Sequence, residues 1–296
     1  MKKKIIFMFL LAITGTFQAQ TARVQVIHNS DDAAAEFVGV YLDATLLIAD
    51  FEFRTAPAFI DAPAELPLDL SVVSRNSSGV KDAIFTATVP LDRGATYAVV
   101  AERNITATGY TLPSSFGFEK SAIGREAATS QANTDCIKHH DSIVAPAVET
   151  GVINPGVTIV SDNSYTEFQE CLELPKDDYL IEVRDETGAV TFASYQAPLA
   201  TSTLDDAAAV LAASGFLDPT KNSNRMVFGL FAALPSGEAL VPLPPTILGI
   251  ESVDSNSFVL NPNPVNNRLN FELSSLDINE LEVRTIDIQV RLVSNT

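Results

Sequence analysis

The chain has 296 residues, of which 46% are hydrophobic and 19% charged, and it contains no Trp and only two Cys. Acidic residues outnumber basic ones by 37 to 19, which gives a formal net charge of −18. Such a surface repels the phosphate backbone of nucleic acids, and no cluster of Lys or Arg reverses the charge locally, so nucleic-acid binding is not expected. The acidity is instead typical of a surface that keeps the protein soluble.

The first twenty residues have the three-part order of a secretory signal peptide. Residues 2–4 are three Lys, residues 5–13 are apolar, and residues 16–20 are small and polar, with cleavage expected near Ala19 or Gln20. Cleavage removes three Lys and no acid, so the mature net charge becomes −21. The apolar run is too short for a permanent span, and no later stretch approaches the roughly 20 apolar residues that a span requires. We therefore expect an exported protein without a transmembrane segment.

The sequence repeats itself once. Residues 28–63 match residues 140–175 without a gap, at an offset of 112 positions. Because this period is longer than the roughly 20 to 50 residues of solenoid repeats, we predict two globular copies, at residues 21–135 and 136–240. The same offset later pairs Ala101 with Ala213, and Phe116-Gly117 with Phe228-Gly229. The identical pairs in the gapless match are His28/His140, Ser30/Ser142, Ala33/Ala145, Ala35/Ala147, Gly39/Gly151, Val40/Val152, Asp50/Asp162 and Pro63/Pro175.

The patterning inside the copies is that of strands. Residues 23–28 and 38–42 alternate polar with apolar side chains, and residues 83–89 and 96–101 are rich in β-forming types. Turns rich in Gly, Asn and Pro separate these runs at short intervals. The pattern favours an all-β fold of two tandem antiparallel β-sandwiches, immunoglobulin-like or prealbumin-like.

One segment has the composition of a helix. Residues 204–213 contain two Asp followed by an Ala-rich run. By the repeat, however, residues 210–213 correspond to residues 98–101, which form a predicted strand. We therefore expect the second half of the segment to be a strand that follows a short turn or helical turn, with tertiary context overriding propensity.

The two cysteines both lie in the second copy. Cys136 and Cys171 correspond, at the offset of 112, to the apolar Val24 and Phe59. If these two apolar residues are neighbours in one core, the cysteines are neighbours in the other. An exported chain can oxidise them, so a disulfide between Cys136 and Cys171 is the hypothesis, and two buried free thiols are the alternative.

No catalytic motif of a metalloprotease, an α/β-hydrolase, a phosphate-binding loop or a calcium loop is found. The repetition of His28 as His140, each with Ser and Asp residues nearby, raises a metal or acid/base site. The alternative, which we favour, is a histidine that ends a strand and caps a turn through its ring nitrogens. Neither catalytic residues nor a metal or cofactor is assigned.

Two further features repeat. Asp50 and Asp162 precede an aromatic residue, and they are either ligand acceptors or residues that close an Asx-turn. The Phe-Gly segments at 116–118 and 228–231 are either an exposed aromatic platform for sugars or part of the core. The absence of Trp weakens the sugar-platform interpretation.

The body of the chain resembles a known family. The segments that carry the likeness are residues 24–33, 39–42, 51–63, 213–219 and 228–235, and it covers nearly all of residues 22–245. They are similar to the domain-of-unknown-function family 4397, which occurs, often in tandem, in exported bacterial proteins. The resemblance implies a β-sandwich surface module and supplies no catalytic residues.

The tail has a different character. Residues 241–257 begin with a Pro-rich run that predicts an extended linker. Residues 258–296 resemble the opening of the C-terminal sorting domain of the Bacteroidota type IX secretion system, on the motif Asn261-Pro262-Asn263-Pro264. We expect strands at residues 269–273 and 286–293.

The tail also departs from that family. Such domains carry a Gly near the position of Val290 and continue for further strands, whereas this chain ends at Thr296, which predicts an incomplete domain. The resemblance implies the type IX machinery as a partner and the outer face of the outer membrane, or the medium, as the location. An ordinary hairpin after a chance Asn-Pro pair is the alternative.

Three function classes follow. The first is a non-enzymatic exported protein whose tandem copies act as binding, adhesion or spacer modules, with an extracellular glycan or protein as the ligand. The second is a carbohydrate-binding component of a polysaccharide-utilisation or biofilm system. The third is a hydrolase, which the missing nucleophile disfavours.

Overall fold

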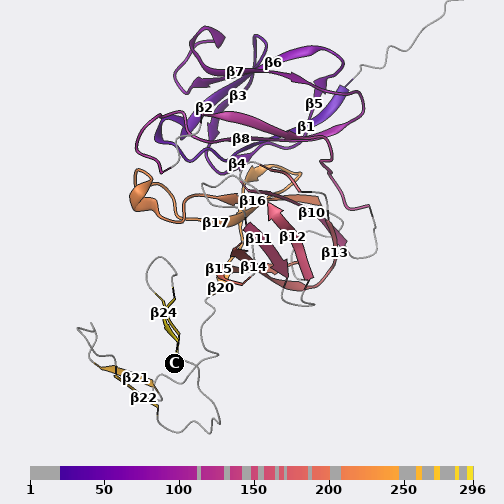
Figure 1. The fold of residues 1–296 in the computed structure, drawn as a ribbon. Coiled ribbons are helices and arrows are strands. Elements are labelled where there is room, and N and C mark those ends of the chain that lie inside the picture. The colour runs from indigo at the N-terminus through magenta and orange to yellow at the C-terminus, as the bar shows by residue number, and fades with distance from the viewer. Residues whose placement is uncertain are drawn as a thin grey trace, which may run out of the picture. The chain divides into compact units, whose positions relative to one another are not determined.

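The computed structural model of the chain is all-β, which confirms the predicted fold class (Figure 1). In the part of the chain that it describes, the regular elements are strands and three short 3-10 helices, and no helix there is long and apolar enough to cross a bilayer. The helices are η1 (Ala33–Ala35), η2 (Val80–Asp82) and η3 (Pro219–Lys221). The structure describes residues 21–111, 115–129, 134–141, 148–152, 157–163, 167–169, 172–185, 189–200, 208–246, 258–261, 270–273, 284–286 and 292–295.

The first copy is a sandwich of two sheets. The β7 sheet has the antiparallel order β3-β2-β6-β7, and the β1 sheet has the order β4-β1-β8-β9, with β5 also on β1 and β18 on β4. The strands of the β7 sheet are β2 (Phe37–Leu42), β3 (Thr45–Glu52), β6 (Pro67–Ser74) and β7 (Ala83–Pro90). Those of the β1 sheet are β1 (Thr21–His28), β4 (Thr55–Ala56), β5 (Ile60–Pro63), β8 (Thr96–Glu102), β9 (Gly117–Ser121) and β18 (Glu238–Ala239).

The β1 sheet is buried on both faces. Val24 and Val26 pack into the core shared with the β7 sheet, because alternate residues of a strand face opposite sides. Ile27, Ala98 and Val100 belong to a second core, and all three are fully buried. Their partners there are Ala56, Val210, Ala233 and Leu240. Two-sided burial suits β1 and β8, which run parallel although the sequence predicted antiparallel sheets.

The second copy repeats the strand order of the first. Its β16 sheet has the order β13-β10-β16-β17-β19, and its β15 sheet has the order β12-β11-β14-β15-β20. The parallel pair recurs as β10 with β16. The strands are β10 (Thr134–Asp141), β11 (Val148–Val152), β12 (Val157–Asn163), β13 (Leu172–Pro175), β14 (Asp178–Asp185), β15 (Thr191–Pro198), β16 (Ala208–Ser214), β17 (Gly229–Ala233), β19 (Val241–Pro242) and β20 (Pro245–Thr246).

The segment with helical composition is a strand, as the repeat predicted. Residues 208–214 form β16, which lies between β10 and β17 in its sheet. Ladder hydrogen bonds on both sides, together with two-sided burial, outweigh the helical propensity of Ala.

The register shows where the gapless repeat fails. His28 lies opposite Ala101, but Ala213, the counterpart of Ala101, lies opposite Asp141 and not His140. Strand β10 is therefore displaced by one residue relative to β1. A displacement of one residue exchanges the two faces of a strand, so His28 and His140 are not equivalent positions in the fold.

The chain divides into two compact units that do not follow the boundary between the copies. The first unit comprises Met1–Val144, Tyr165–Lys176 and Thr203–Pro242; the second comprises Ala145–Ser164, Asp177–Ser202 and Leu243–Thr296. The β16 sheet belongs to the first unit because it shares the second core with the β1 sheet. Figure 1 shows the three layers of this unit, the β7 sheet, the β1 sheet and the β16 sheet.

The tail contains two hairpins. Strand β21 (Phe258–Asn261) pairs with β22 (Asn270–Leu273), and β23 (Arg284–Ile286) pairs with β24 (Leu292–Asn295). The strand expected near residues 269–273 is therefore present as β22. The single strand predicted over residues 286–293 is wrong, because Ile286 in β23 pairs antiparallel with Leu292 in β24, so the two ends of that range belong to different strands. Asn261 ends β21, whereas Pro262, Asn263, Pro264 and the expected signal peptide lie outside the described residues.

Candidate functional site

Four consecutive polar residues follow β1 and are almost completely buried: Asn29, Ser30, Asp31 and Asp32. We call these residues and their partners the polar cluster. The Ser30 hydroxyl donates to the carbonyl oxygen of Arg103 at 2.5 Å, and the Asn29 amide donates to the carbonyl oxygen of Ala213 at 2.8 Å. The cluster therefore joins the end of β1 to the end of β8 in its own copy and to β16, in a different sheet, in the other copy.

Asp31 forms a buried ion pair with Arg225. The Arg225 Nε donates to the Asp31 Oδ1 at 2.9 Å, and the backbone N–H of Met226 donates to Oδ2 at 2.8 Å. The Asp31 side chain is 3% exposed and that of Arg225 16%. Burial raises the pKa of Asp31 above its ordinary value, and the bonds from Arg225 and Met226 oppose that shift. The β16–β17 connection of the second copy, residues 215–228, is thereby attached to the first.

Asp32 holds the equivalent connection of the first copy, residues 103–116 between β8 and β9. Its Oδ1 caps the first turn of η1 by accepting from the backbone N–H of Ala34, and it also accepts from the Thr106 hydroxyl, both at 2.9 Å. Its Oδ2 accepts from the backbone N–H of Thr106 at 2.6 Å. Three donors on a fully buried carboxylate satisfy it without a cation.

The two connections also bind each other. The rings of Tyr110 and Phe216 lie with centroids 5.6 Å apart, and the backbone N–H of Thr111 donates to the Asn222 side chain at 2.9 Å. The Ser223 hydroxyl donates to the carbonyl oxygen of Gly109 at 2.9 Å. Equivalent segments of the two copies are thus joined by both an aromatic contact and hydrogen bonds.

Arg54 adds a second cation to this junction. Its Nε donates to the Ser214 hydroxyl at 2.9 Å, and its Nη2 donates to the carbonyl oxygen of Val227 at 3.1 Å. The guanidinium lies 4.0 Å from the Phe231 ring centroid and 4.9 Å from that of Phe53. The Arg54 guanidinium stacks on two rings and donates hydrogen bonds in its own plane. It therefore holds the groups that it contacts in a defined orientation.

His28 is fully buried and neutral. Its Nδ1 accepts from the backbone N–H of Ser30 at 3.3 Å, so its Nε2 carries the proton and donates to the carbonyl oxygen of Ala35 at 2.7 Å. Burial lowers its pKa to about 4, and the hydrogen bond to Ala35 opposes that shift. Its ring packs 5.1 Å from that of Phe51. With both nitrogens in use, His28 caps a turn and has no lone pair available for a metal.

The other residues singled out from the sequence lie apart from the polar cluster. Asp50 is inside β3 and pairs with Arg75 at 2.7 Å, with both side chains more than half exposed, so it does not close an Asx-turn. Asp162 and His140 lie in β12 and β10. Cys136 is in β10 and Cys171 lies outside the described residues, so the disulfide stays a prediction. Among the described residues, no three His, Cys, Asp or Glu side chains come together as a metal site.

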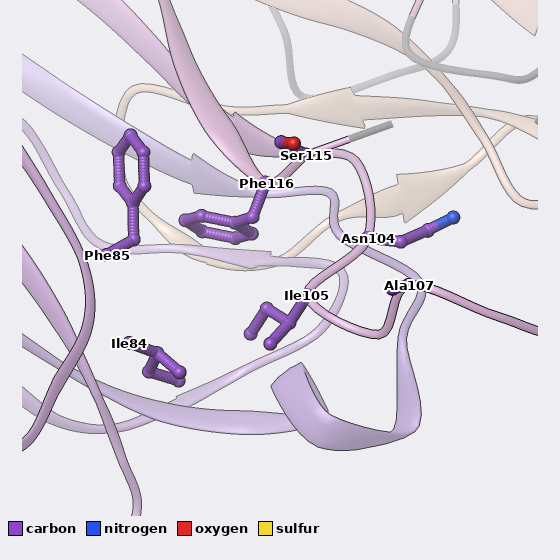
Figure 2. A pocket seen from close by; sticks show the side chains of 7 residues that line it. All are labelled: Ile84, Phe85, Asn104, Ile105, Ala107, Ser115 and Phe116. Atoms are coloured by element: carbon purple, nitrogen blue, oxygen red, sulfur yellow. The ribbon is translucent and has the colours of Figure 1, made fainter. Parts of the chain in front are cut away.

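A pocket of about 300 Å³ lies beside the β7 sheet (Figure 2). Strand β7 supplies Ile84 and Phe85 to it, and the β8–β9 connection supplies Ile105. Figure 2 shows the Phe85 and Phe116 rings and the side chains of Ile84 and Ile105 gathered around one space, with the Asn104 side chain directed away from the rings. The remaining lining residues are Asn104, Ala107, Ser115 and Phe116.

The pocket is suited to binding an apolar group. Phe116 is 7% exposed, and its ring contacts those of Phe85 and Phe118 edge-on at 5.3 and 5.7 Å, so the Phe116 segment belongs to the core and is not an exposed platform. No lining residue is titratable. The pocket combines the apolar side chains of Ile84, Phe85, Ile105 and Phe116 with the polar side chains of Asn104 and Ser115, so it can accept a mainly apolar side chain. The sequence did not indicate it, because its walls come from segments about twenty residues apart.

The comparisons with known proteins add no further assignment. No protein-family model matches the chain, and no curated protein is significantly similar to it. The resemblances to domain-of-unknown-function family 4397 and to the type IX sorting domain therefore stay predictions.

Proposed function

We propose that the chain is a non-enzymatic exported protein of the bacterial cell surface. Its two β-sandwich copies act as a binding and spacing body, and its C-terminal segment serves for secretion and anchoring by the type IX machinery. One observation carries the non-enzymatic part: the polar residues after β1, which are the chain's best candidates for chemistry, are buried and bonded between the two copies.

Catalysis depends on where the polar side chains are directed. Acid/base and nucleophilic catalysis require a polar side chain that reaches a bound substrate. Asp31 instead neutralises Arg225, Asp32 accepts three internal hydrogen bonds, and His28 has both ring nitrogens in use. Asn29 and Asp31 attach the β16 sheet and the β16–β17 connection of the second copy to the first copy, which suits a structural role. The pocket beside β7 is lined mainly by apolar side chains, and it suits recognition.

The export and anchoring part is tested by cell fractionation. Cells that produce the full chain, and cells that produce a chain without residues 248–296, are treated with a protease that cannot cross the outer membrane. We expect the full chain to be degraded at the surface and the shortened chain to be protected inside. Surface exposure of the shortened chain would remove the anchoring role of the tail.

The non-enzymatic part is tested on the mature chain, residues 21–296, with panels of ester, peptide and glycoside substrates. We expect no turnover above the uncatalysed rate. Turnover that is lost in the Asp32→Asn variant while the fold is retained would contradict the structural role of the polar cluster.

A further inference from the structure

Strand β7 is an edge strand without charged side chains. It is the last strand of its sheet, and its eight residues, Ala83–Pro90, include no charged side chain. The opposite edge, β3, carries Asp50 and Glu52, and β9, which ends the β1 sheet, carries Glu119 and Lys120. Charged residues on an edge strand discourage the pairing of a further strand. Of these three edges, only β7 lacks that protection.

The second copy shows which kind of segment pairs with the equivalent edge strand. Strand β15 occupies the place of β7 in the repeated strand order, and β20 pairs with it antiparallel, Tyr195 opposite Pro245. The backbone N–H of Gln196 also donates to the carbonyl oxygen of Pro244 at 2.8 Å. The covering segment is extended, uncharged and rich in proline. In the described part of the first copy, no strand pairs with the free side of β7.

The pocket lies where a strand added to β7 would place a side chain. The Phe85 side chain lies on the face of β7 that packs against the core between the two sheets. It lines the pocket together with Ile105 and Phe116. A neighbouring strand lies about 4.8 Å away, and its residues on the same face lie beside those of β7. A bulky apolar residue of the added strand would therefore enter the pocket. Backbone bonds along an edge and one side-chain pocket are together the elements of recognition by strand addition.

The net charge distinguishes between two sources of the added strand, a second copy of this chain and another protein. A second copy of the mature chain carries the same net charge of −21, so two copies repel each other. We propose that the β7 edge and its pocket bind an extended, uncharged peptide segment of another protein, with a bulky apolar side chain in the pocket. This inference rests on the proposed binding role and names its partner.

The experiment uses the mature chain, residues 21–296, and a fluorescent peptide with the sequence of residues 240–248, which includes the segment that covers β15. Fluorescence anisotropy should show saturable binding. The Thr86→Lys/Thr88→Lys variant places two cations on exposed positions of β7 and should weaken binding about tenfold or more. The matched control is Leu46→Lys on the edge strand β3, where the side chain is 47% exposed, and it should leave binding unchanged.

A second variant tests the pocket without changing the edge. Ala107 is exposed and lines the pocket, so Ala107→Phe should fill it and weaken binding by about tenfold while β7 stays intact. If the double lysine variant fails to fold, Ala107→Phe by itself tests whether the pocket takes part in binding.

Three results would overturn the inference: no saturable binding by the wild-type chain, binding that neither the double lysine variant nor Ala107→Phe weakens, or a wild-type dimer in sedimentation that the lysines dissociate. The last result would assign the edge to a second copy. Surface exposure and turnover are measured independently of β7, so a failure here is distinguishable from a failure of the proposed function.

Discussion

The polar cluster and the pocket meet at the same connection, residues 103–116, and they are built in opposite ways. Thr106 donates twice to the buried Asp32, whereas Ile105 and Ala107, on either side of it, line the pocket. In the cluster, polar atoms find their partners inside the molecule and join the two copies. In the pocket, apolar groups remain accessible. Substitutions in the cluster are therefore expected to lower stability, because its buried polar atoms would lose their internal partners, whereas substitutions at the exposed rim of the pocket are expected to change stability less.

The largest effect is expected at the buried ion pair. Arg225→Met leaves the Asp31 carboxylate buried without its cation and should lower the free energy of unfolding by about 3 kcal/mol. Urea unfolding followed by circular dichroism measures this. Lys221→Met removes an exposed cation from the same connection and should cause no measurable change. Adding Asp31→Asn to Arg225→Met should recover at least part of the loss; a further loss would show that the carboxylate acts through other contacts.

His28 should make stability depend on pH. Its folded pKa of about 4 is below the ordinary 6.5, so the unfolded chain binds the proton more readily and stability falls as the pH drops through this window. The contribution lost between pH 7 and pH 5 is about 2 kcal/mol. His28→Gln cannot titrate, so its unfolding free energy should change less over the same range. Equal slopes for the two proteins would mean that other groups carry the dependence.

A smaller effect is expected at Thr106. Thr106→Val keeps the shape of the side chain but removes the hydroxyl that donates to Asp32, while the backbone N–H bond remains. We expect a loss of about 1 kcal/mol in the free energy of unfolding. Thr108→Val, on the same connection and exposed, serves as the control. Equal losses in the two variants would remove Asp32 as the cause.

The smallest effect is expected at the rim of the pocket. Ile84 is 41% exposed, so Ile84→Ser should change the free energy of unfolding by less than about 0.5 kcal/mol. Ile27→Val removes a single methylene from the second core, where Ile27 is fully buried, and should cost about 1 kcal/mol. If the two substitutions cost the same, the pocket is a part of the core and the contrast with the polar cluster fails.

The repeat was the most informative part of the sequence, and its limits are instructive. It identified residues 210–213, which lie in β16, as a strand against their helical composition, since the pairing of β16 with β10 and β17 repeats that of β8 with β1 and β9. It also aligned His28 with His140, which the register separates by one position. A gapless match of side chains cannot detect a displacement of one strand, because the register is set by ladder bonds and by which face is buried.

The sequence by itself determined that the chain is all-β, and it placed strands such as those at residues 23–28, 38–42, 83–89 and 96–101, because alternation and turn residues are local properties. Only the tertiary structure decided the partners. The pairing of Asp31 with Arg225 joins residues 194 positions apart, and the second core joins β1 to β16. Such contacts depend on which faces of the sheets are packed together, and no local pattern in the chain records that. The pocket beside β7 has the same origin, since it exists only where the strand and the β8–β9 connection meet.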